Sequence, residues 1–234
     1  PTIFVPVSKK KKLQRFAEMK TMPHVVQFHF GNLASGFHPL RGKWKSEFFK
    51  NDKPLVLELG CGKGEYTVGM ARRFPEKNFV GVDIKGARMF IGAKQALDEN
   101  LNNAAFLRTR IDFINAIFGE NEVDEIWITF PDPQKEKEIK RLTAPLFLQR
   151  YWHMLKPEGI IHLKTDSVLL HEYTQLVIRE DDHTLITANS DVHNTISDEN
   201  DVLRAIRTTY EKKFLNLGMA ITYISFQLKK DYAR

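Results

Sequence analysis

The sequence predicts an α/β fold: a mostly parallel, seven-stranded sheet with helices on both faces and an antiparallel last strand. Two observations lead to this prediction. From residue 54 onward, short runs rich in β-branched and aromatic residues alternate with segments typical of helices, as expected for strands joined by crossover helices. The first strand is followed at once by a glycine-rich turn and a helix. We therefore expect one domain over residues 51–234.

The elements follow from these runs in order. The last strand is the longest and has the clearest pattern, and a Lys-Pro-Glu-Gly turn at residues 156–159 closes one helix before the next strand. The expected strands lie at residues 54–59, 78–83, 104–108, 123–130, 159–164, 184–189 and 221–228. The expected helices lie at residues 64–74, 86–100, 145–155, 167–179 and 201–215.

Residues 1–50 show no such alternation. Glycine and proline interrupt a stretch rich in histidine and aromatic residues, which we interpret as a basic arm or lid packed on the domain. This region contains His24, His29 and His38. Their spacing matches no common pattern of metal ligands, so no metal site is predicted.

The composition is that of a globular protein with a modest positive charge. Hydrophobic residues make up 42% of the chain, enough for a core, and no apolar run is long enough to cross a bilayer. The net charge of +6 suits either a nucleic-acid partner or an ordinary basic surface. Basic residues gather in two runs: Lys9 to Lys12 with Arg15, and Lys135, Lys137, Lys140 and Arg141.

The single cysteine, Cys61, excludes an internal disulfide bond and favours a reducing compartment. No signal-peptide pattern opens the sequence. We therefore expect a cytoplasmic protein. Because no histidine lies beside Cys61 in sequence, we interpret this residue as a small one that fills the glycine-rich turn, not as a nucleophile.

The glycine-rich turn begins after Glu58 and has the form Gly60-x-Gly62-x-Gly64. Glycines let the backbone turn tightly and approach a ligand, and the following helix offers free N–H groups. A dinucleotide-binding turn would need glycine at position 65, where the chain has Glu65. The acid at position 58 disfavours a pyrophosphate and suits a cofactor with cationic sulfonium and amino groups. The turn therefore predicts S-adenosylmethionine as the cofactor.

Two further acids follow the next two strands. Asp83 ends the second strand, where a carboxylate can accept hydrogen bonds from both ribose hydroxyls, and Asp112 follows the third strand, near the expected adenine edge. Each acid alone is also typical of a helix N-cap or a solvated turn. Together with the glycine-rich turn, their positions on consecutive strand ends support the cofactor prediction.

The fourth strand ends in Phe130-Pro131-Asp132-Pro133. Ligands of such sheets bind beyond the carboxyl ends of the strands, and the two prolines fix the backbone on both sides of Asp132. The mixed-charge loop of residues 134–141 comes next. It suits either a solvated surface segment or one that positions a phosphate backbone beside the site.

These motifs resemble, in this order, those of the bacterial tRNA (guanine-N7)-methyltransferases, a family with the Rossmann-like fold of class I S-adenosylmethionine-dependent methyltransferases. The resemblance spans residues 54–228, and it also includes Lys164-Thr165-Asp166 and Thr208-Thr209-Tyr210-Glu211. It implies transfer of a methyl group from S-adenosylmethionine to N7 of a guanosine in the tRNA variable loop (m7G46).

The resemblance also implies the roles of single residues. Asp132 has the catalytic role. Cofactor contacts fall on Glu58, Asp83, Asp112 and Asp132, and the glycine-rich turn itself adds Gly60, Gly62 and Gly64. Substrate contacts fall on Lys135 or Lys137, Asp166, Thr208 and Glu211. From the residues alone, Asp166 also suits a helix cap, and Thr208 and Glu211 suit structural roles.

The chain departs from the family pattern in three places. Gln134 stands where the family usually has tryptophan, and Asp83 stands where it usually has glutamate. The basic loop is also shorter, so the family's substrate lysine falls on either Lys135 or Lys137.

Guanine N7 carries a lone pair and no proton, so its methylation needs no general base. We expect Asp132 to orient the reactants and to stabilise the positive charge that develops on the purine. Asp166, Thr208 and Glu211 are then expected to accept hydrogen bonds from the guanine N1–H and amino group.

Two other functions fit parts of the pattern. Amino-group methyltransferases, acting on a nucleic-acid base or a protein side chain, often carry an Asn/Asp-Pro-Pro-Tyr-like motif at this strand end, whereas here Pro133 is followed by Gln134. A cofactor-binding RNA scaffold without catalysis belongs to a different class, and an activity measurement separates it. For the assembly, both a monomer and a homodimer stay open.

Overall fold

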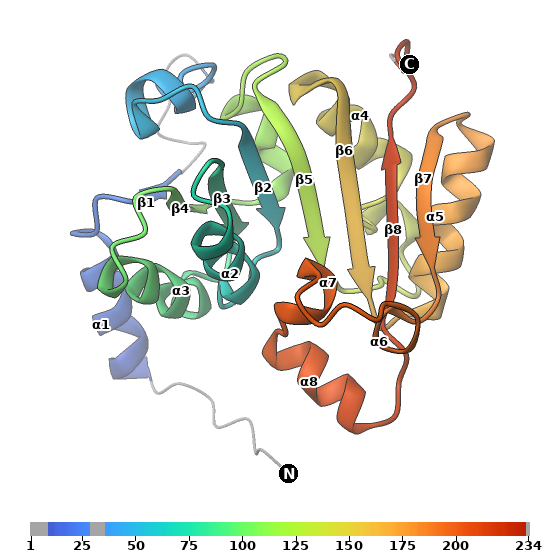
Figure 1. Cartoon of the computed structure of the whole chain (residues 1–234). Helices are drawn as coiled ribbons and strands as arrows, with labels where there is room; N and C mark the ends of the chain where they lie inside the picture. Colours follow the sequence, from blue (N-terminus) through green and yellow to red (C-terminus); the bar gives the residue numbers. More distant parts are fainter. Residues whose placement is uncertain (1–8, 29–35, 233–234) are drawn as a thin grey trace.

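The structure, a computed structural model, describes residues 9–28 and 36–232 (Figure 1). His29 of the N-terminal region and the side chains of Lys9 to Lys11 in the first basic run lie outside the described part. The strands are β1 (Val25–Gln27), β2 (Leu55–Leu59), β3 (Asn78–Asp83), β4 (Ala104–Arg108), β5 (Val123–Thr129), β6 (Leu155–Thr165), β7 (Thr184–Asn189) and β8 (Thr222–Gln227).

Within the described residues these strands form one eight-stranded sheet, in the order β1-β4-β3-β2-β5-β6-β8-β7. Strand β8 lies antiparallel between β6 and β7, and the other neighbouring strands pair in parallel. The mostly parallel sheet and the antiparallel last strand are therefore confirmed, whereas the predicted number of seven strands is wrong.

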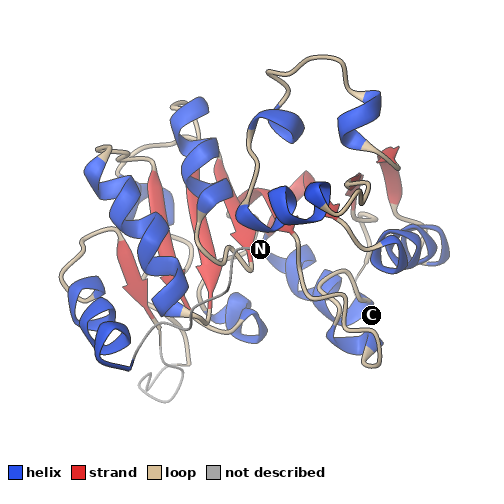
Figure 2. Cartoon of the chain, turned by 90° about the horizontal axis from the view of Figure 1, so that it is seen from below, coloured by secondary structure: helices blue, strands red, loops and turns tan. Residues whose placement is uncertain are grey.

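Helices cover both faces of the sheet, as predicted (Figure 2). Helices α1, α2 and α3 lie on one face, and α4 and α5 lie on the other (Figure 1). The α-helices are α1 (Lys9–Met19), α2 (Glu65–Arg73), α3 (Gly86–Asp98), α4 (Pro145–Met154), α5 (Val168–Glu180), α6 (Val192–Thr195), α7 (Val202–Ala205) and α8 (Thr209–Asn216). The π-helix η2 (Trp44–Phe49) and the 3₁₀-helices η3 (Ile111–Ala116) and η4 (Glu138–Lys140) complete the set. No helix in the described ranges has the length and apolar character needed to span a membrane.

The helices bury an apolar core against each face of the sheet. One core joins side chains of α4 and α5 to the central strands, and the other joins α2 and α3 to the opposite face. All five residues of β2 are buried, which is typical of a parallel strand covered on both faces. The continuous apolar runs that predicted the central strands have this cause.

The eighth strand comes from the region that we interpreted as an arm. Strand β1 pairs in parallel with β4, with Val26 opposite Leu107. Helix α1 packs against α3, and Arg15 donates a hydrogen bond from its guanidinium to the carbonyl oxygen of Ala87. A three-residue strand is too short to show a period of two, which is why the sequence did not reveal it. The domain boundary near residue 50 stays a prediction.

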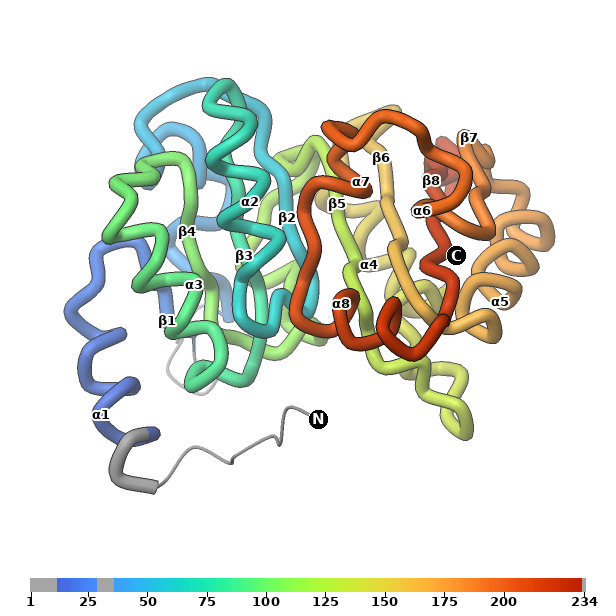
Figure 3. The backbone as a smooth tube through the Cα atoms, turned by 60° about the horizontal axis from the view of Figure 1, so that its bottom comes forward, coloured from blue at the N-terminus to red at the C-terminus, as the bar shows by residue number. Residues whose placement is uncertain are grey.

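Two local predictions are also wrong. The helix expected at residues 201–215 is split into α7 and α8, because residues 206–208 leave the helical conformation and Thr208 caps α8. The turn expected at residues 156–159 lies inside β6, where the pairing with β5 shifts and Glu158 adopts a φ of +67°. The chain between β7 and β8 folds as the three short helices α6, α7 and α8. Figure 3 shows them lying across the edge of the sheet that is lowest in Figure 1.

Gly92 in α3 lets this helix lie directly against the glycine-rich turn of residues 60–64, which we call the glycine loop. A Cβ atom at this position would lie 2.5 Å from the carbonyl oxygen of Lys63 and 2.9 Å from the Cα atom of Gly64. Both neighbours are backbone, so they yield only if the loop moves. The contact between α3 and the loop therefore excludes any side chain at position 92.

We predict that Gly92→Ala lowers the free energy of unfolding by about 1–3 kcal/mol, the usual cost of overpacking. In an unhindered helix the same change stabilises by about 1 kcal/mol, so the sign of the effect is diagnostic. Urea denaturation measures it, with Gln95→Ala on the exposed side of α3 as a control expected to stay within about 0.5 kcal/mol. A Gly92→Ala variant as stable as wild type would contradict the close contact.

Candidate active site

Acidic residues line one edge of the sheet. Five neighbouring strands, β4, β3, β2, β5 and β6, end in or are followed by an acid, and their carboxyl ends meet at the lower edge in Figure 1 because they run parallel. In this strand order the acids are Asp112, Asp83, Glu58, Asp132 and Asp166. The topology thus brings to one edge residues that the sequence separates by more than a hundred positions.

The glycine loop has the backbone that the sequence predicts. Gly60, Gly62 and Gly64 adopt φ values of +78°, +56° and +72°, a region that residues other than glycine rarely adopt. A Cβ atom at Gly60 would meet nothing within 4 Å, and one at Gly62 would meet only the Gly60 carbonyl oxygen at 3.9 Å. The loop therefore curves around open space that a ligand can approach.

Glu58 is buried beneath this loop and faces the protein. Its side chain is 5% exposed. One carboxylate oxygen accepts hydrogen bonds from the Thr67 backbone N–H (2.8 Å) and hydroxyl (2.5 Å), and the other accepts one from the Thr129 hydroxyl (2.6 Å). Burial raises the pKa of Glu58 to about 7, although these hydrogen bonds oppose the shift. Glu58 thus joins β2 to α2 and β5.

Asp83 holds the glycine loop from the other side. Its carboxylate accepts hydrogen bonds from the backbone N–H groups of Gly62 (2.9 Å) and Lys85 (2.7 Å). The side chain is only half-buried, and each carboxylate oxygen keeps a lone pair that these two hydrogen bonds do not use. Asp112 lies farther along the edge in η3, where it is exposed and forms ion pairs with Arg110 (3.2 Å) and Arg150 (3.7 Å).

Asp132 lies exposed in a loop with a strained backbone. Its Oδ1 atom accepts a hydrogen bond from the Gln134 N–H at 3.0 Å. Phe130 and Gln134, on either side of the Pro-Asp-Pro sequence, adopt φ values of +48° and +46°. Left-handed backbone at such residues costs about 1–3 kcal/mol each and gathers at functional sites. The loop therefore presents the Asp132 carboxylate in a conformation that the rest of the protein must hold.

Arg141 is one residue that holds it. Its Nε atom donates a hydrogen bond to the Pro133 carbonyl oxygen at 3.2 Å, and its guanidinium lies 4.3 Å from the centre of the Tyr173 ring. Arg141 is 6% exposed, so this member of the second basic run lies inside the protein and is closed to a phosphate. Lys135 and Lys137 are exposed in the loop beside Asp132.

Asp166 follows the end of β6 and does not cap the next helix. The hydroxyl of Ser167 accepts the N-cap hydrogen bond of α5, from the Leu170 N–H at 3.3 Å. Partial burial raises the pKa of Asp166, an effect that the nearby Lys213 charge opposes. The Asp166 carboxylate is thus left for another role at the edge.

Thr208 and Glu211 make structural contacts, the roles that the residues alone suggested. The Thr208 hydroxyl accepts a hydrogen bond from the Glu211 N–H at 3.1 Å and caps α8. The Glu211 side chain is completely buried, with Oε1 2.8 Å from both Lys164 Nζ and His193 Nε2. Oε2 has no hydrogen-bond partner among the described residues. The contact of Glu211 with guanine stays a prediction, and in this conformation its buried carboxylate is closed to solvent.

Lys164 is a site residue to which sequence reasoning assigned no role. Its fully buried ammonium donates to the carbonyl oxygen of Leu203 at 2.6 Å and pairs with Glu211 at 2.8 Å. Lys164 thereby attaches the α7–α8 segment to the end of β6, next to Asp166. A lysine in a strand carries no sequence signal of such a partner, since the acid lies 47 positions later.

The same segment also attaches to the glycine loop. Glu65 accepts hydrogen bonds from the Thr209 N–H at 2.9 Å and hydroxyl at 2.6 Å, and Lys63 Nζ donates to that hydroxyl at 3.0 Å. The Phe130 ring packs against the Phe214 ring of α8, with 6.2 Å between the ring centres. One segment thus contacts the glycine loop, the Asp132 loop and the end of β6.

Comparison with known proteins gives this edge its context. A family model of putative methyltransferases matches residues 52–224. The tRNA (guanine-N(7)-)-methyltransferase of Porphyromonas gingivalis is 53% identical over 213 residues, which are 90% of this chain and 86% of that protein. This chain belongs to the tRNA (guanine-N7)-methyltransferase family. The family member from Christiangramia forsetii is 51% identical over 222 residues, 94% of this chain and 99% of its own.

The motif resemblance found in the sequence is therefore confirmed. Among solved structures, the 16S rRNA methyltransferase KamB superimposes with a TM-score of 0.58 at 15% identity, covering 76% of this chain and 88% of that chain. At this identity the similarity shows the fold alone, which is that of the class I methyltransferases.

We predict that Lys164→Met lowers the free energy of unfolding by about 3–5 kcal/mol, because it leaves Glu211 buried without its cation. The double variant Lys164→Met/Glu211→Leu should be more stable than either single variant. Chemical denaturation of all three measures the coupling. Lys94→Met, in an exposed ion pair with Asp98, is the control, with an expected change below about 1 kcal/mol. A double variant as unstable as the summed single variants would contradict the coupling.

The raised pKa of Glu58 predicts a dependence of stability on pH. Between pH 4.5 and about 7, the folded state keeps a proton on Glu58 that the unfolded state has released. Stability therefore falls as pH rises through this window. Relative to wild type, Glu58→Gln should gain up to about 3 kcal/mol across it, since each pKa unit is worth about 1.4 kcal/mol. Denaturation of the ligand-free protein from pH 4.5 to 8 measures the difference, and a constant difference would contradict the shift.

Proposed function

We propose that this chain transfers the methyl group of S-adenosylmethionine to N7 of a guanosine in the tRNA variable loop, in the cytoplasm. The observation that carries the proposal is the strained loop that presents Asp132 on the sheet edge shared with the glycine loop. Relatives about half identical over nearly the whole chain are named tRNA (guanine-N(7)-)-methyltransferases.

The residues at the edge fit S-adenosylmethionine. Open space beside Gly60 and Gly62 leaves room for the cofactor against the loop backbone. Asp83 is half-buried with lone pairs to spare, which suits the ribose hydroxyls, and Asp112 lies beyond it in the direction proposed for the adenine. Glu58 supports the loop from beneath, and as a carboxylate it adds negative potential below a cationic ligand. When bound, the cofactor supplies an electrophilic methyl group.

The chemistry asks little of the protein beyond orientation and charge. Guanine N7 has a free lone pair, so no side chain has to remove a proton. The purine becomes cationic as the methyl group arrives, and a fixed carboxylate near it lowers the energy of that charge. Asp132 is held by its own Asx-type hydrogen bond to Gln134 and by the strained loop, so it needs no reorganisation during the reaction.

The half of the site that would read guanine lies on β6 and α8. Asp166 is half-buried, and its carboxylate does not cap α5 because Ser167 does. It is therefore suited to accept a hydrogen bond from the guanine N1–H or amino group. Thr208 and Glu211 fix the position of α8 from inside the protein, and this supports the guanine-reading part of the site. Lys135 and Lys137 are exposed beside Asp132, where they can contact phosphates of the tRNA.

The product identifies the reaction. Incubation with unmodified tRNA and labelled S-adenosylmethionine, followed by digestion to nucleosides and mass spectrometry, should yield 7-methylguanosine. A tRNA whose variable-loop guanosine is replaced by adenosine should yield none. An amino-methylated base, or binding of both ligands without transfer, would contradict the proposal.

We predict that Asp132→Asn lowers kcat by about 10²–10³-fold, the usual cost of removing one transition-state electrostatic contact. Asparagine keeps the oxygen that accepts from Gln134, so the fold and the loop should persist, as circular dichroism and thermal unfolding can verify. Asp231→Asn, an exposed acid near the C-terminus, is the matched control and should keep full activity. Near-normal turnover by Asp132→Asn would remove Asp132 from the mechanism.

A further inference from the structure

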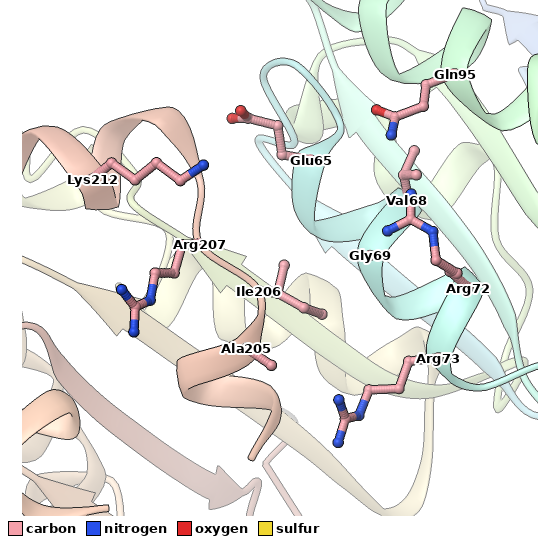
Figure 4. Close-up of a pocket in the computed structure, with 10 residues that line it drawn as sticks. All are labelled: Glu65, Val68, Gly69, Arg72, Arg73, Gln95, Ala205, Ile206, Arg207 and Lys212. Atoms are coloured by element: carbon pink, nitrogen blue, oxygen red, sulfur yellow. The ribbon is translucent and has the colours of Figure 1, made fainter. Parts of the chain in front are cut away.

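A groove runs along the outer side of α2, from Glu65 beside the glycine loop to Arg73 at the other end of the helix. Helix α2 forms one wall and residues 205–212 form the other, and the cavity between them has a volume of about 620 Å³ (Figure 4). We call it the α2 groove. It is lined by Glu65, Val68, Gly69, Arg72, Arg73, Gln95, Ala205, Ile206, Arg207 and Lys212.

The groove owes its narrow floor to Gly69. A Cβ atom at this position would lie 2.9 Å from the Ile206 side chain, so a larger residue here would have to displace Ile206 from its contact with α2. Ile206 is half-buried in this contact. The two walls are thus held at a set distance by packing at the floor, while the charged side chains stand at the rims (Figure 4).

Basic residues outnumber acidic ones in the lining of the groove, although Arg72 is paired with Glu99. Four of its lining residues are basic and one is acidic. The acid, Glu65, already accepts two hydrogen bonds from Thr209. Within the described part of the chain, the exposed Arg207 guanidinium makes one hydrogen bond, to the Arg204 carbonyl oxygen, and the exposed Lys212 ammonium makes none. Donors on these two side chains therefore remain for an anion.

The groove is continuous with the active site. Glu65, at one end, follows Gly64 of the glycine loop directly, and on the opposite wall Arg207 and Lys212 flank the buried Thr208 and Glu211 in sequence. Along α2 the groove extends from Glu65 to Arg73, about 12 Å at 1.5 Å per helical residue. This length exceeds one phosphate, so a polyanion, rather than a single anion, matches the row of charges.

We propose that the α2 groove binds the sugar-phosphate backbone of the RNA that flanks the guanosine in the active site. The inference rests on the proposed function, and it adds the path that the RNA takes away from the reacting base. Arginine and lysine that line a cleft focus positive potential and attract phosphates. Displacement of counterions from the RNA then drives binding without any reading of the base sequence.

The test neutralises the two cations that have donors to spare, in the double variant Arg207→Gln/Lys212→Gln. Affinity for unmodified tRNA is measured without cofactor over a series of salt concentrations, and steady-state methylation is measured separately. The matched control, Arg179→Gln/Lys230→Gln, removes two exposed charges, one from α5 and one near the C-terminus, and neither residue lines the α2 groove. Figure 1 shows α5 on the opposite face of the sheet from α2. Thermal unfolding verifies that both variants are folded.

With the RNA backbone in the groove, the double variant should bind tRNA about tenfold more weakly near 0.1 M salt. The slope of log affinity against log salt should fall by about one to two, because each lost phosphate contact contributes about 0.7–0.9. KM for tRNA should rise by a similar factor, with kcat at saturating tRNA within about twofold of wild type. The control variant should lose less than half as much of the slope.

Equal losses in the two double variants would overturn the proposal, since the effect would then come from net charge alone. An unchanged salt slope in a folded Arg207→Gln/Lys212→Gln variant would overturn it as well, even if 7-methylguanosine is formed normally. Binding of tRNA by a wild-type protein that forms no 7-methylguanosine would defeat the proposed function, and the salt slopes would still decide whether the groove holds RNA.

Discussion

Three hydrogen bonds to the buried carboxylate of Glu58 join the strand that precedes the glycine loop to the helix that follows it and to the neighbouring strand β5. The loop is therefore anchored at both of its ends to the same side chain. Asp83 then fixes the middle of the loop through the Gly62 N–H. Two acids that a sequence pattern assigns to a ligand thus first shape the protein surface on which that ligand would lie.

A second set of buried polar contacts unites the two halves of the site. Lys164 and Glu211 form an ion pair that is closed to solvent, and removal of charges from water is favourable only when both find good partners. The pair fixes the α7–α8 segment relative to β6, while Glu65 and Lys63 fix it relative to the glycine loop. The position of α8 is consequently set by charge pairing more than by apolar packing, as its largely exposed residues indicate.

The sequence predicted what depends on local pattern. Apolar runs located every strand of the sheet except β1, and the glycine loop and the acids at strand ends followed from spacing along the chain. What it did not predict depends on contacts between distant segments. Arg141 resembles any charged loop residue until Pro133 and Tyr173 are placed beside it, and the burial of Glu211 appears only once Lys164 is seen opposite it. The break between α7 and α8 likewise depends on the contacts of Lys164 with the Leu203 carbonyl oxygen and with Glu211.

The pairing of β1 with β4 has a consequence for the order of folding. Residues 25–27 bind to residues 106–108, so the first strand of the chain can pair only after most of the first three β–α units exist. Closing so long a loop carries an entropic cost that only the finished edge of the sheet can offset. During synthesis on the ribosome, the N-terminal segment therefore waits unpaired while the chain behind it folds, and its docking marks the completion of this half of the molecule.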